Sequence, residues 1–200
     1  KSDLGNLISY AKKKESYILF FEKGIVNTRL SVNEYDYTLV SRFSSNINTA
    51  LLTDKNEIWY GTNKGLFLRF SNSAVEYQFK EFKGKRINDL CVFNNDVLIA
   101  TDEDLFIYKP TTNKVSSYTF QNKLNKFGVK SFDVIEDEIY GIGKGNIIKI
   151  STAKTNFLFD EANPIVSELE FTSLSKNNNK FLIGTQGKGI YVYKNNKDFY

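Results

Sequence analysis

The chain contains no histidine, no methionine and a single cysteine, Cys91, among its 200 residues. Without imidazole there is no Ser-His or Cys-His nucleophile pair, no histidine-ligated zinc and no near-neutral histidine base. One cysteine excludes a disulfide within the chain. Chemistry based on carboxylates, lysine or tyrosine is still open, but histidine-dependent enzyme classes are excluded.

Long apolar runs and a strong net charge are also lacking. The longest apolar run, Tyr17–Phe21, is far shorter than a transmembrane helix requires. There is no initiator methionine and no signal-like apolar region, so we expect a soluble, trimmed or mature piece that makes no membrane contact itself. The formal net charge of +4 is modest, and we therefore expect no nucleic-acid partner.

A repeat of about 40 residues dominates the sequence. Its best copy is INTALLTDKNEIWYGTNKGLFLRF, Ile47–Phe70, and weaker copies begin at Ile87, Val129 and Val166. A small residue follows the second apolar run of each copy, at intervals of 39, 41 and 43 residues: Gly61, Ala100, Gly141 and Gly184. The segment SYILFFEKGIVNTRL extends the series, with Phe21 aligned to Gly61. The predicted units are 4–46, 47–86, 87–128, 129–164 and 165–200.

Each unit is expected to form four short strands and almost no helix. In the second unit the predicted strands are 47–53, 57–61, 66–70 and 75–80. The first strand of every unit is expected to be the most buried, and the fourth strand of the second unit is expected to pack on one face only. Tandem four-stranded units of this length predict an all-β chain, a β-propeller of four-stranded antiparallel blades with about five blades, forming one domain over 1–200. The last unit stops as its outer strand begins. Either Lys1–Gly5 supplies a closing strand or, as we expect, the chain is part of a larger propeller.

The second unit resembles the two-component regulator propeller repeat of periplasmic sensor regions in bacterial hybrid histidine kinases. The matching residues are Ile47, Leu51, Asp54, Ile58, Trp59, Gly61, Thr62, Gly65 and Leu66. The fifth unit keeps Ile183, Gly184, Thr185, Gly189 and Ile190. The resemblance implies a periplasmic or extracellular location and a membrane-anchored parent protein with a kinase module. Similar repeats also occur in propellers attached to bacterial secretion machinery.

Lysine recurs in the turns between second and third strands. Lys23–Gly24, Lys64–Gly65, Lys144–Gly145 and Lys188–Gly189 occupy this place in four of the five units. In a propeller these turns share a rim with the loops that join blades, which predicts a basic rim. The candidate ligand-binding residues on it are Lys64, Lys83, Lys85, Arg86, Lys144 and Lys188. One interpretation is a mouth that attracts an acidic glycan, another anionic ligand or an acidic protein; the other is ordinary solvated turns.

Other groups favour structural explanations. Four carboxylates fall on or beside predicted inner strands: Asp89, Asp133, Glu168 and Glu170. No spacing matches a calcium loop, so we expect hydration or pairing with Lys130, and no metal or cofactor. Trp59 is expected to pack between sheets rather than to stack on a sugar. Cys91 is expected to be a small buried hydrophobe, and 102–104 a surface acidic turn.

The sequence thus predicts a non-catalytic, extracytoplasmic propeller that binds a ligand or partner, as the sensor region of a two-component signal-transduction regulator. The first alternative is a protein-interaction scaffold of a bacterial surface or secretion apparatus. The second is a propeller glycosidase or lyase, which requires two carboxylates facing each other about 5–10 Å apart across a pocket.

Overall fold

A computed structural model describes most of the chain. The described residues are 3–30, 35–43, 45–70, 75–102, 104–117, 129–135, 138–143, 146–150, 155–157, 169–177, 180–194 and 198–199. The chain divides into two compact units, Lys1–Val92 and Phe93–Tyr200. Each unit is considered by itself, and the single domain expected from the sequence stays a prediction.

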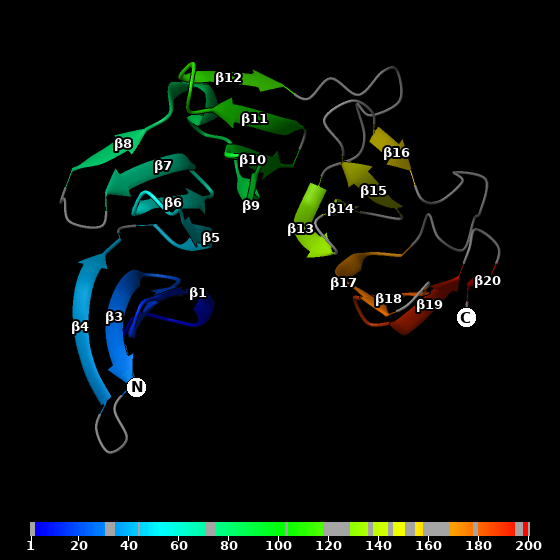
Figure 1. Cartoon of the computed structure of the whole chain (residues 1–200), viewed down its shortest axis with the longest axis horizontal. Helices are drawn as coiled ribbons and strands as arrows, with labels where there is room; N and C mark the ends of the chain where they lie inside the picture. Colours follow the sequence, from blue (N-terminus) through cyan, green and yellow to red (C-terminus); the bar gives the residue numbers. More distant parts are fainter. Residues whose placement is uncertain are drawn as a thin grey trace. The chain divides into compact units, whose positions relative to one another are not determined.

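Five antiparallel sheets of four strands each follow one another along the chain (Figure 1). The first contains β1 Leu7–Lys13, β2 Ser16–Phe21, β3 Gly24–Leu30 and β4 Tyr35–Arg42; the second contains β5 Ile47–Leu52, β6 Glu57–Thr62, β7 Gly65–Phe70 and β8 Glu76–Gln78. The third contains β9 Ile87–Phe93, β10 Asp96–Thr101, β11 Leu105–Lys109 and β12 Lys114–Ser117. The fourth contains β13 Val129–Ile135, β14 Glu138–Gly143, β15 Asn146–Ile150 and β16 Thr155–Phe157. The fifth contains β17 Phe171–Asn177, β18 Lys180–Thr185, β19 Gly189–Lys194 and β20 Asp198–Phe199.

Strands pair in chain order within every sheet, so each sheet is an up-and-down meander. The only helical element among the described residues is one 3-10 turn, Lys80–Phe82. This confirms the all-β prediction with its four-stranded antiparallel units, the architecture of propeller blades. Asp3 and Leu4 lie in a turn and Gly5 belongs to no strand, so these residues do not form the closing strand that the sequence left open as an alternative.

In the second, third and fourth sheets the second strand is more buried than the first strand, contrary to the sequence prediction, whereas in the fifth sheet β17 has more buried residues than β18. All residues of β6, β10 and β14 after the first are buried, whereas β5, β9 and β13 include several half-exposed positions. The reason is position. A second strand has a hydrogen-bonded neighbour on each side, whereas a first strand lies at the edge of its sheet and leaves one side uncovered.

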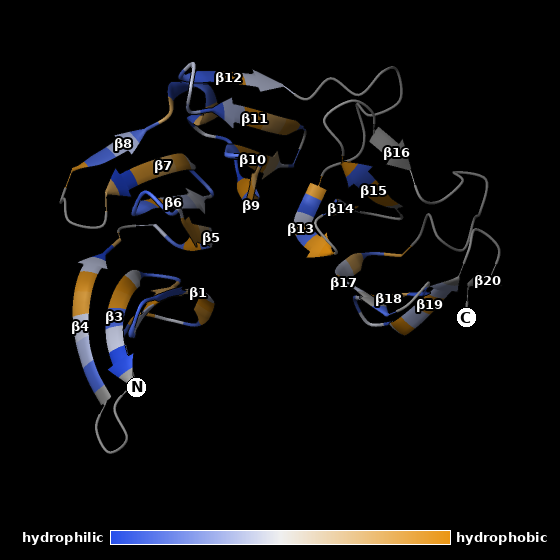
Figure 2. Ribbon diagram, viewed as in Figure 1, coloured by the Kyte–Doolittle hydropathy of each residue, from blue (hydrophilic) through white to orange (hydrophobic). Residues whose placement is uncertain are grey.

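The fourth strand of the second sheet is also shorter than predicted. It covers only Glu76–Gln78, and Val75 and Tyr77 are both 56% exposed instead of packed. Figure 2 shows β8 and β12 as largely hydrophilic, in contrast to β7. The chain leaves the sheet at Phe79, whose ring stacks on Trp59, with centroids 5.1 Å apart.

The cores lie between successive sheets. In the first unit, the core combines β2 and β3 of the first sheet with β5 and β6 of the second: Ile18, Phe20, Ile25, Ile47, Ala50, Ile58 and Tyr60. In the second unit, the core combines the fourth and fifth sheets: Tyr140, Ile142, Ile147, Leu169, Phe171, Leu174, Ile183 and Tyr193. A sheet alone cannot cover these faces, so packing depends on neighbouring repeats.

Register also corrects the repeat alignment. Gly61 lies opposite Thr49, and Gly184 lies opposite Ser173, as expected for equivalent positions. In the fourth sheet, however, the equivalent Ser131 lies opposite Ile142, so Gly141 is one position away from the aligned slot. In the first sheet Ser9 lies opposite Phe20 rather than Phe21. The sequence pattern aligned the repeats, and hydrogen-bond register shifts the first and fourth of them by one residue.

Candidate functional site

The turn between β6 and β7 carries Lys64 and is held by its neighbours. The Thr62 hydroxyl donates to the Gly65 carbonyl at 3.2 Å and accepts from the Lys64 N–H at 2.9 Å. Gly65 has a φ of +139°, and a Cβ on it would lie 2.8 Å from the Phe82 carbonyl oxygen. Glycine is therefore needed both for this backbone conformation and for the close approach of the following loop.

That loop joins the second sheet to the third and carries the other cations. The Gly84 N–H donates to the Lys64 carbonyl at 2.9 Å, so the loop lies directly against the β6–β7 turn. Phe82 is fully buried and anchors the loop. This arrangement brings together the basic turn cluster, which we define as Lys64, Lys83, Lys85 and Arg86. The side chains of Lys64, Lys83 and Arg86 are exposed, and that of Lys85 is half-buried.

The same arrangement recurs in other repeats. The Phe43 N–H donates to the Lys23 carbonyl at 3.0 Å, so Lys23 occupies the equivalent place in the first sheet. In the fifth sheet the Thr185 hydroxyl donates to the Gly189 carbonyl at 2.8 Å, and Lys188 of that turn is exposed. Lys188 belongs to the second of the two compact units, Phe93–Tyr200. Lys144 lies outside the described residues.

The third sheet has an acidic turn in this place. The Thr101 hydroxyl donates to the Asp104 carbonyl at 2.8 Å, and Asp102 and Asp104 are exposed, as predicted. Threonine therefore closes the turn in the second, third and fifth sheets. The sequence showed the recurring Gly-Thr pair but not this role, which depends on the hydroxyl reaching across the turn.

The inner-strand carboxylates make protein contacts. Asp89 accepts from the Thr49 hydroxyl at 2.8 Å, and Asp133 accepts from the Leu174 N–H at 2.9 Å. Glu170 forms an ion pair with Lys130 at 3.3 Å, which confirms that predicted pairing. Glu168 lies outside the described residues. No group of three or more acidic or cysteine side chains suited to a metal ion occurs in the described part of the chain.

Trp59 is 1% exposed and stacks on Phe79, so it offers no platform to a sugar. Its indole N–H donates to Glu57 at 3.3 Å, and the Tyr140 hydroxyl donates to Glu138 at 2.7 Å in the fourth sheet. These glutamates begin their strands, so both carboxylates are hydrogen-bond partners of buried aromatic side chains. Cys91 is half-buried rather than fully buried.

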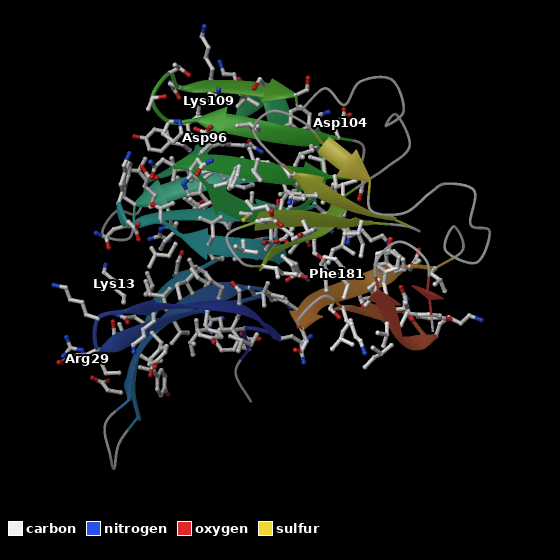
Figure 3. All side chains as sticks on the ribbon, turned by 45° about the vertical axis from the view of Figure 1, so that its right-hand side comes forward. Lys13, Arg29, Asp96, Asp104, Lys109 and Phe181 are labelled. Atoms are coloured by element: carbon white, nitrogen blue, oxygen red, sulfur yellow. The ribbon has the colours of Figure 1, made fainter. Side chains whose placement is uncertain are left out.

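The structure also reveals a pocket that the sequence did not indicate. Its volume is about 560 Å³, and it lies between the first sheet and β6 of the second. Lys13 and Arg29 line it, and Figure 3 shows both at the same end of the first sheet. The signal was present as the alternation of Ile25, Asn27 and Arg29 along one strand. Only the packing of the second sheet against that face makes it a pocket.

One carboxyl group, on Glu22, and one phenolic hydroxyl group, on Tyr60, have displaced pKa values. Hydrogen bonds from the backbone and the side chain of Asn6, at 3.1 and 3.0 Å, lower the pKa of Glu22. Burial raises the pKa of Tyr60, and its hydrogen bond to Glu76 adds to the shift. Neither Glu22 nor Tyr60 belongs to the basic turn cluster.

The helices of the described residues include none long and apolar enough to cross a bilayer. No protein-family model matches the chain, and no curated protein matches it.

Solved structures do match. The extracellular domain of a protein named as the hybrid two-component system BT4673 of B. thetaiotaomicron superposes with a TM-score of 0.75 at 15% identity, covering 96% of this chain and 27% of that one. The extracellular domain of BT3049, also named as a hybrid two-component system of that organism, gives 0.68 at 14% identity, covering 94% and 26%. PorZ, a surface component of the type-IX secretion system of Porphyromonas gingivalis, gives 0.55 at 11% identity, covering 98% and 32%.

This chain therefore spans about a quarter of the length of the two extracellular domains. At these identities the likeness establishes the fold. Within that limit, the resemblance inferred from the repeat to the propellers of hybrid two-component sensors is confirmed.

Proposed function

We propose that this chain is an extracytoplasmic, non-catalytic part of a larger β-propeller in the sensor region of a two-component regulator. The observation that carries the proposal is the likeness to the extracellular domain of BT4673, with a TM-score of 0.75 over 96% of this chain. The repeat motif in Ile47–Phe70 supports it independently, because the motif rests on residue identities and not on coordinates.

The basic turn cluster is the proposed ligand surface. Three exposed cations on one rim raise the local concentration of anions, and the buried Phe82 holds their loop in place. An acidic oligosaccharide fits this arrangement, since its spaced carboxylates can meet several cations along the rim. Ligand binding then favours one arrangement of the parent protein, and that bias reaches the distant kinase.

The test is a thermal shift with oligogalacturonate at low salt, with a neutral maltooligosaccharide for comparison. We expect Lys64→Ser/Lys83→Ser/Arg86→Ser to lose most of the shift, because surface electrostatic binding depends on these charges and on low ionic strength. The matched control is Lys55→Ser/Lys109→Ser/Lys114→Ser, which removes the same charge from exposed positions elsewhere. If both triple variants keep the shift, the cluster is not the ligand surface.

A scaffold function is the second candidate, and the likeness to PorZ favours it. A scaffold predicts a stable protein partner and no shift with either oligosaccharide. The non-catalytic part of the proposal has its own readout. Oligogalacturonate incubated with the protein should keep its chain length, and shortened products would point to a glycosidase or lyase.

A further inference from the structure

The pocket of about 560 Å³ between the first sheet and β6 differs from the basic turn cluster in place and in composition. It opens beside the β1–β2 turn, whereas the cluster lies at the β6–β7 turn. Its volume falls in the range of about 300–1,000 Å³ that small-molecule sites occupy. It is therefore large enough to hold a compact organic molecule.

Cross-strand pairing explains how this pocket acquires two kinds of surface. Lys13, Ser16 and Arg29 are paired across β1, β2 and β3, so their side chains share one face at the rim. On the same face of β2 and β3, farther from the β1–β2 turn, Phe20 pairs with Ile25. In an antiparallel sheet directly opposed residues lie on the same side. The face thus changes from cationic at the rim to apolar in depth.

The apolar end is closed from both sheets. Ile18 and Ile25 come from the first sheet, and Ile58 comes from the second; all three are buried. Val40 is half-buried beside them, at the point where the β3–β4 register shifts. The aliphatic stems of Lys13 and Arg29 extend this apolar surface toward the mouth.

The mouth carries an excess of positive charge. Lys13, Lys14 and Arg29 line it together with one carboxylate, Glu15. Within the part of the chain that the structure describes, none of the three cations forms an ion pair. A guanidinium beside two ammonium groups is suited to a carboxylate or phosphate, and partial enclosure strengthens that attraction relative to open solvent.

We propose that this pocket binds a small organic anion that joins a compact apolar body to one carboxylate or phosphate group. The anionic group lies between Arg29 and Lys13, and the apolar body lies toward Val40 and Ile58. The inference goes beyond the proposed function, because it does not depend on what the basic turn cluster binds.

The test uses 4-phenylbutyrate, phenyl phosphate and the neutral 4-phenylbutyramide as probes, with isoleucine and valine methyl NMR as the readout. We expect both anions to shift the methyl signals of Val40 and Ile58, and the amide to bind at least about tenfold more weakly. The two anions distinguish carboxylate from phosphate preference. Equal binding of the amide, or unshifted methyl signals in the wild-type protein, would overturn the proposal without any variant.

Variants then assign the charges. Lys13→Gln/Arg29→Gln should weaken binding of the anions about tenfold or more and leave the amide unchanged. The control, Lys12→Gln/Lys109→Gln, removes the same charge; Lys12 pairs with Tyr17 on the opposite face of the first sheet, and this variant should bind as wild type does. Equal affinity in both doubles would overturn the assignment. Lys64→Ser/Lys83→Ser/Arg86→Ser should leave the methyl shifts intact, which separates this site from the proposed sensor surface.

Discussion

Gly61 and Thr62 show how adjacent residues of the repeat motif have separate functions. A Cβ on Gly61 would collide with the Ile87 side chain and lie 3.0 Å from a methyl group of Thr49, so glycine permits the next sheet to approach. Thr62 closes the following turn through its hydroxyl. The Gly-Thr pair is therefore explained by packing and turn geometry, without a ligand.

Tyr60 links stability to pH. Its ring stacks on Phe67, with centroids 5.1 Å apart, and the residue is 2% exposed. Burial and the hydrogen bond to Glu76 raise its pKa above the ordinary 10.0. The unfolded chain therefore ionises first as pH rises. The stabilisation from neutral Tyr60 is complete below about pH 10 and is lost as pH rises from there toward the folded pKa.

We predict that the free energy of unfolding falls more steeply above about pH 10 in the wild type than in Tyr60→Phe. One differential proton corresponds to about 1.4 kcal/mol per pH unit. Urea unfolding at pH values from about 9 to 11 measures the difference. Glu76→Gln should retain most of the wild-type slope, because burial is the larger cause. Parallel profiles for wild type and Tyr60→Phe would contradict the prediction.

Between the sheets, a recurring β-bulge prepares the contact with the next repeat. The register shifts after the first residue of β1, β5, β13 and β17. Two of the residues left unpaired by these shifts reach the next sheet: Asn48 donates to the Ile87 carbonyl at 3.0 Å, and Lys130 pairs with Glu170 at 3.3 Å. A bulge turns its extra side chain out of the ladder, which suits it to bridging.

The position after the bulge also bridges sheets. The Ser9 hydroxyl donates to the Ala50 carbonyl at 2.9 Å, and the Thr49 hydroxyl donates to the Asp89 carboxylate at 2.8 Å. These two bonds occupy equivalent positions in successive repeats but differ in the charge of the acceptor. Hydrogen bonds to ionised acceptors are the stronger class.

We predict that Thr49→Val lowers the free energy of unfolding by about 1–2 kcal/mol, and that Ser9→Ala lowers it by about 0.5–1 kcal/mol. Valine keeps the shape of threonine but cannot donate to Asp89. Urea unfolding of both variants, of Asp89→Asn and of Thr49→Val/Asp89→Asn provides the comparison, since the double variant minus the two single variants gives the energy of the Thr49–Asp89 pair. An equal or larger cost for Ser9→Ala would contradict the role of charge.

Gly61 and Gly184 occupy the same position of the repeat, and comparing them offers a test of packing. In the second sheet Gly61 faces the fully buried Ile87, whereas in the fifth sheet Gly184 faces the hydroxyl of exposed Ser173. A buried isoleucine cannot move aside, but a surface hydroxyl can rotate. We predict that Gly61→Ala costs about 1–3 kcal/mol.

Gly184→Ala should change stability by less than about 1 kcal/mol, since a glycine replaced without strain also restricts the unfolded chain. Midpoints of urea unfolding measure both variants. Similar losses in the two would mean that the contact with Ile87 is not the reason for glycine in this place.

In the molecule as a whole, the modest net charge of +4 conceals local separation. Lys64, Lys83 and Arg86 lie on the β6–β7 turn and on the loop that is hydrogen-bonded to it, while Lys13 and Arg29 line the pocket between the first two sheets. Each group is created by chain segments that meet only on folding. The proposed binding at each group is tested separately by the oligogalacturonate and phenylbutyrate experiments.

Much of the fold followed from local pattern. Strand-forming residues, turn residues and a period near 40 residues are properties of nearby positions, so five four-stranded meanders could be predicted before any coordinates. The place of Lys64 in a tight turn was predictable for the same reason. The order of strands along the chain was enough to place the other candidate residues in the neighbouring loop: Lys83, Lys85 and Arg86.

Other features depend on hydrogen-bond register within a sheet and on packing between sheets, and local pattern does not encode them. The one-residue shift that places Ile142, and not Gly141, opposite Ser131 follows from hydrogen-bond register. The high burial of β6, β10 and β14 follows from neighbouring strands on both sides. The pocket beside Lys13 and Arg29 exists because a second sheet covers the face on which they lie. Periodicity thus determined the repeating unit, and the packing of one unit on the next decided which of its side chains are buried, paired or open to a ligand.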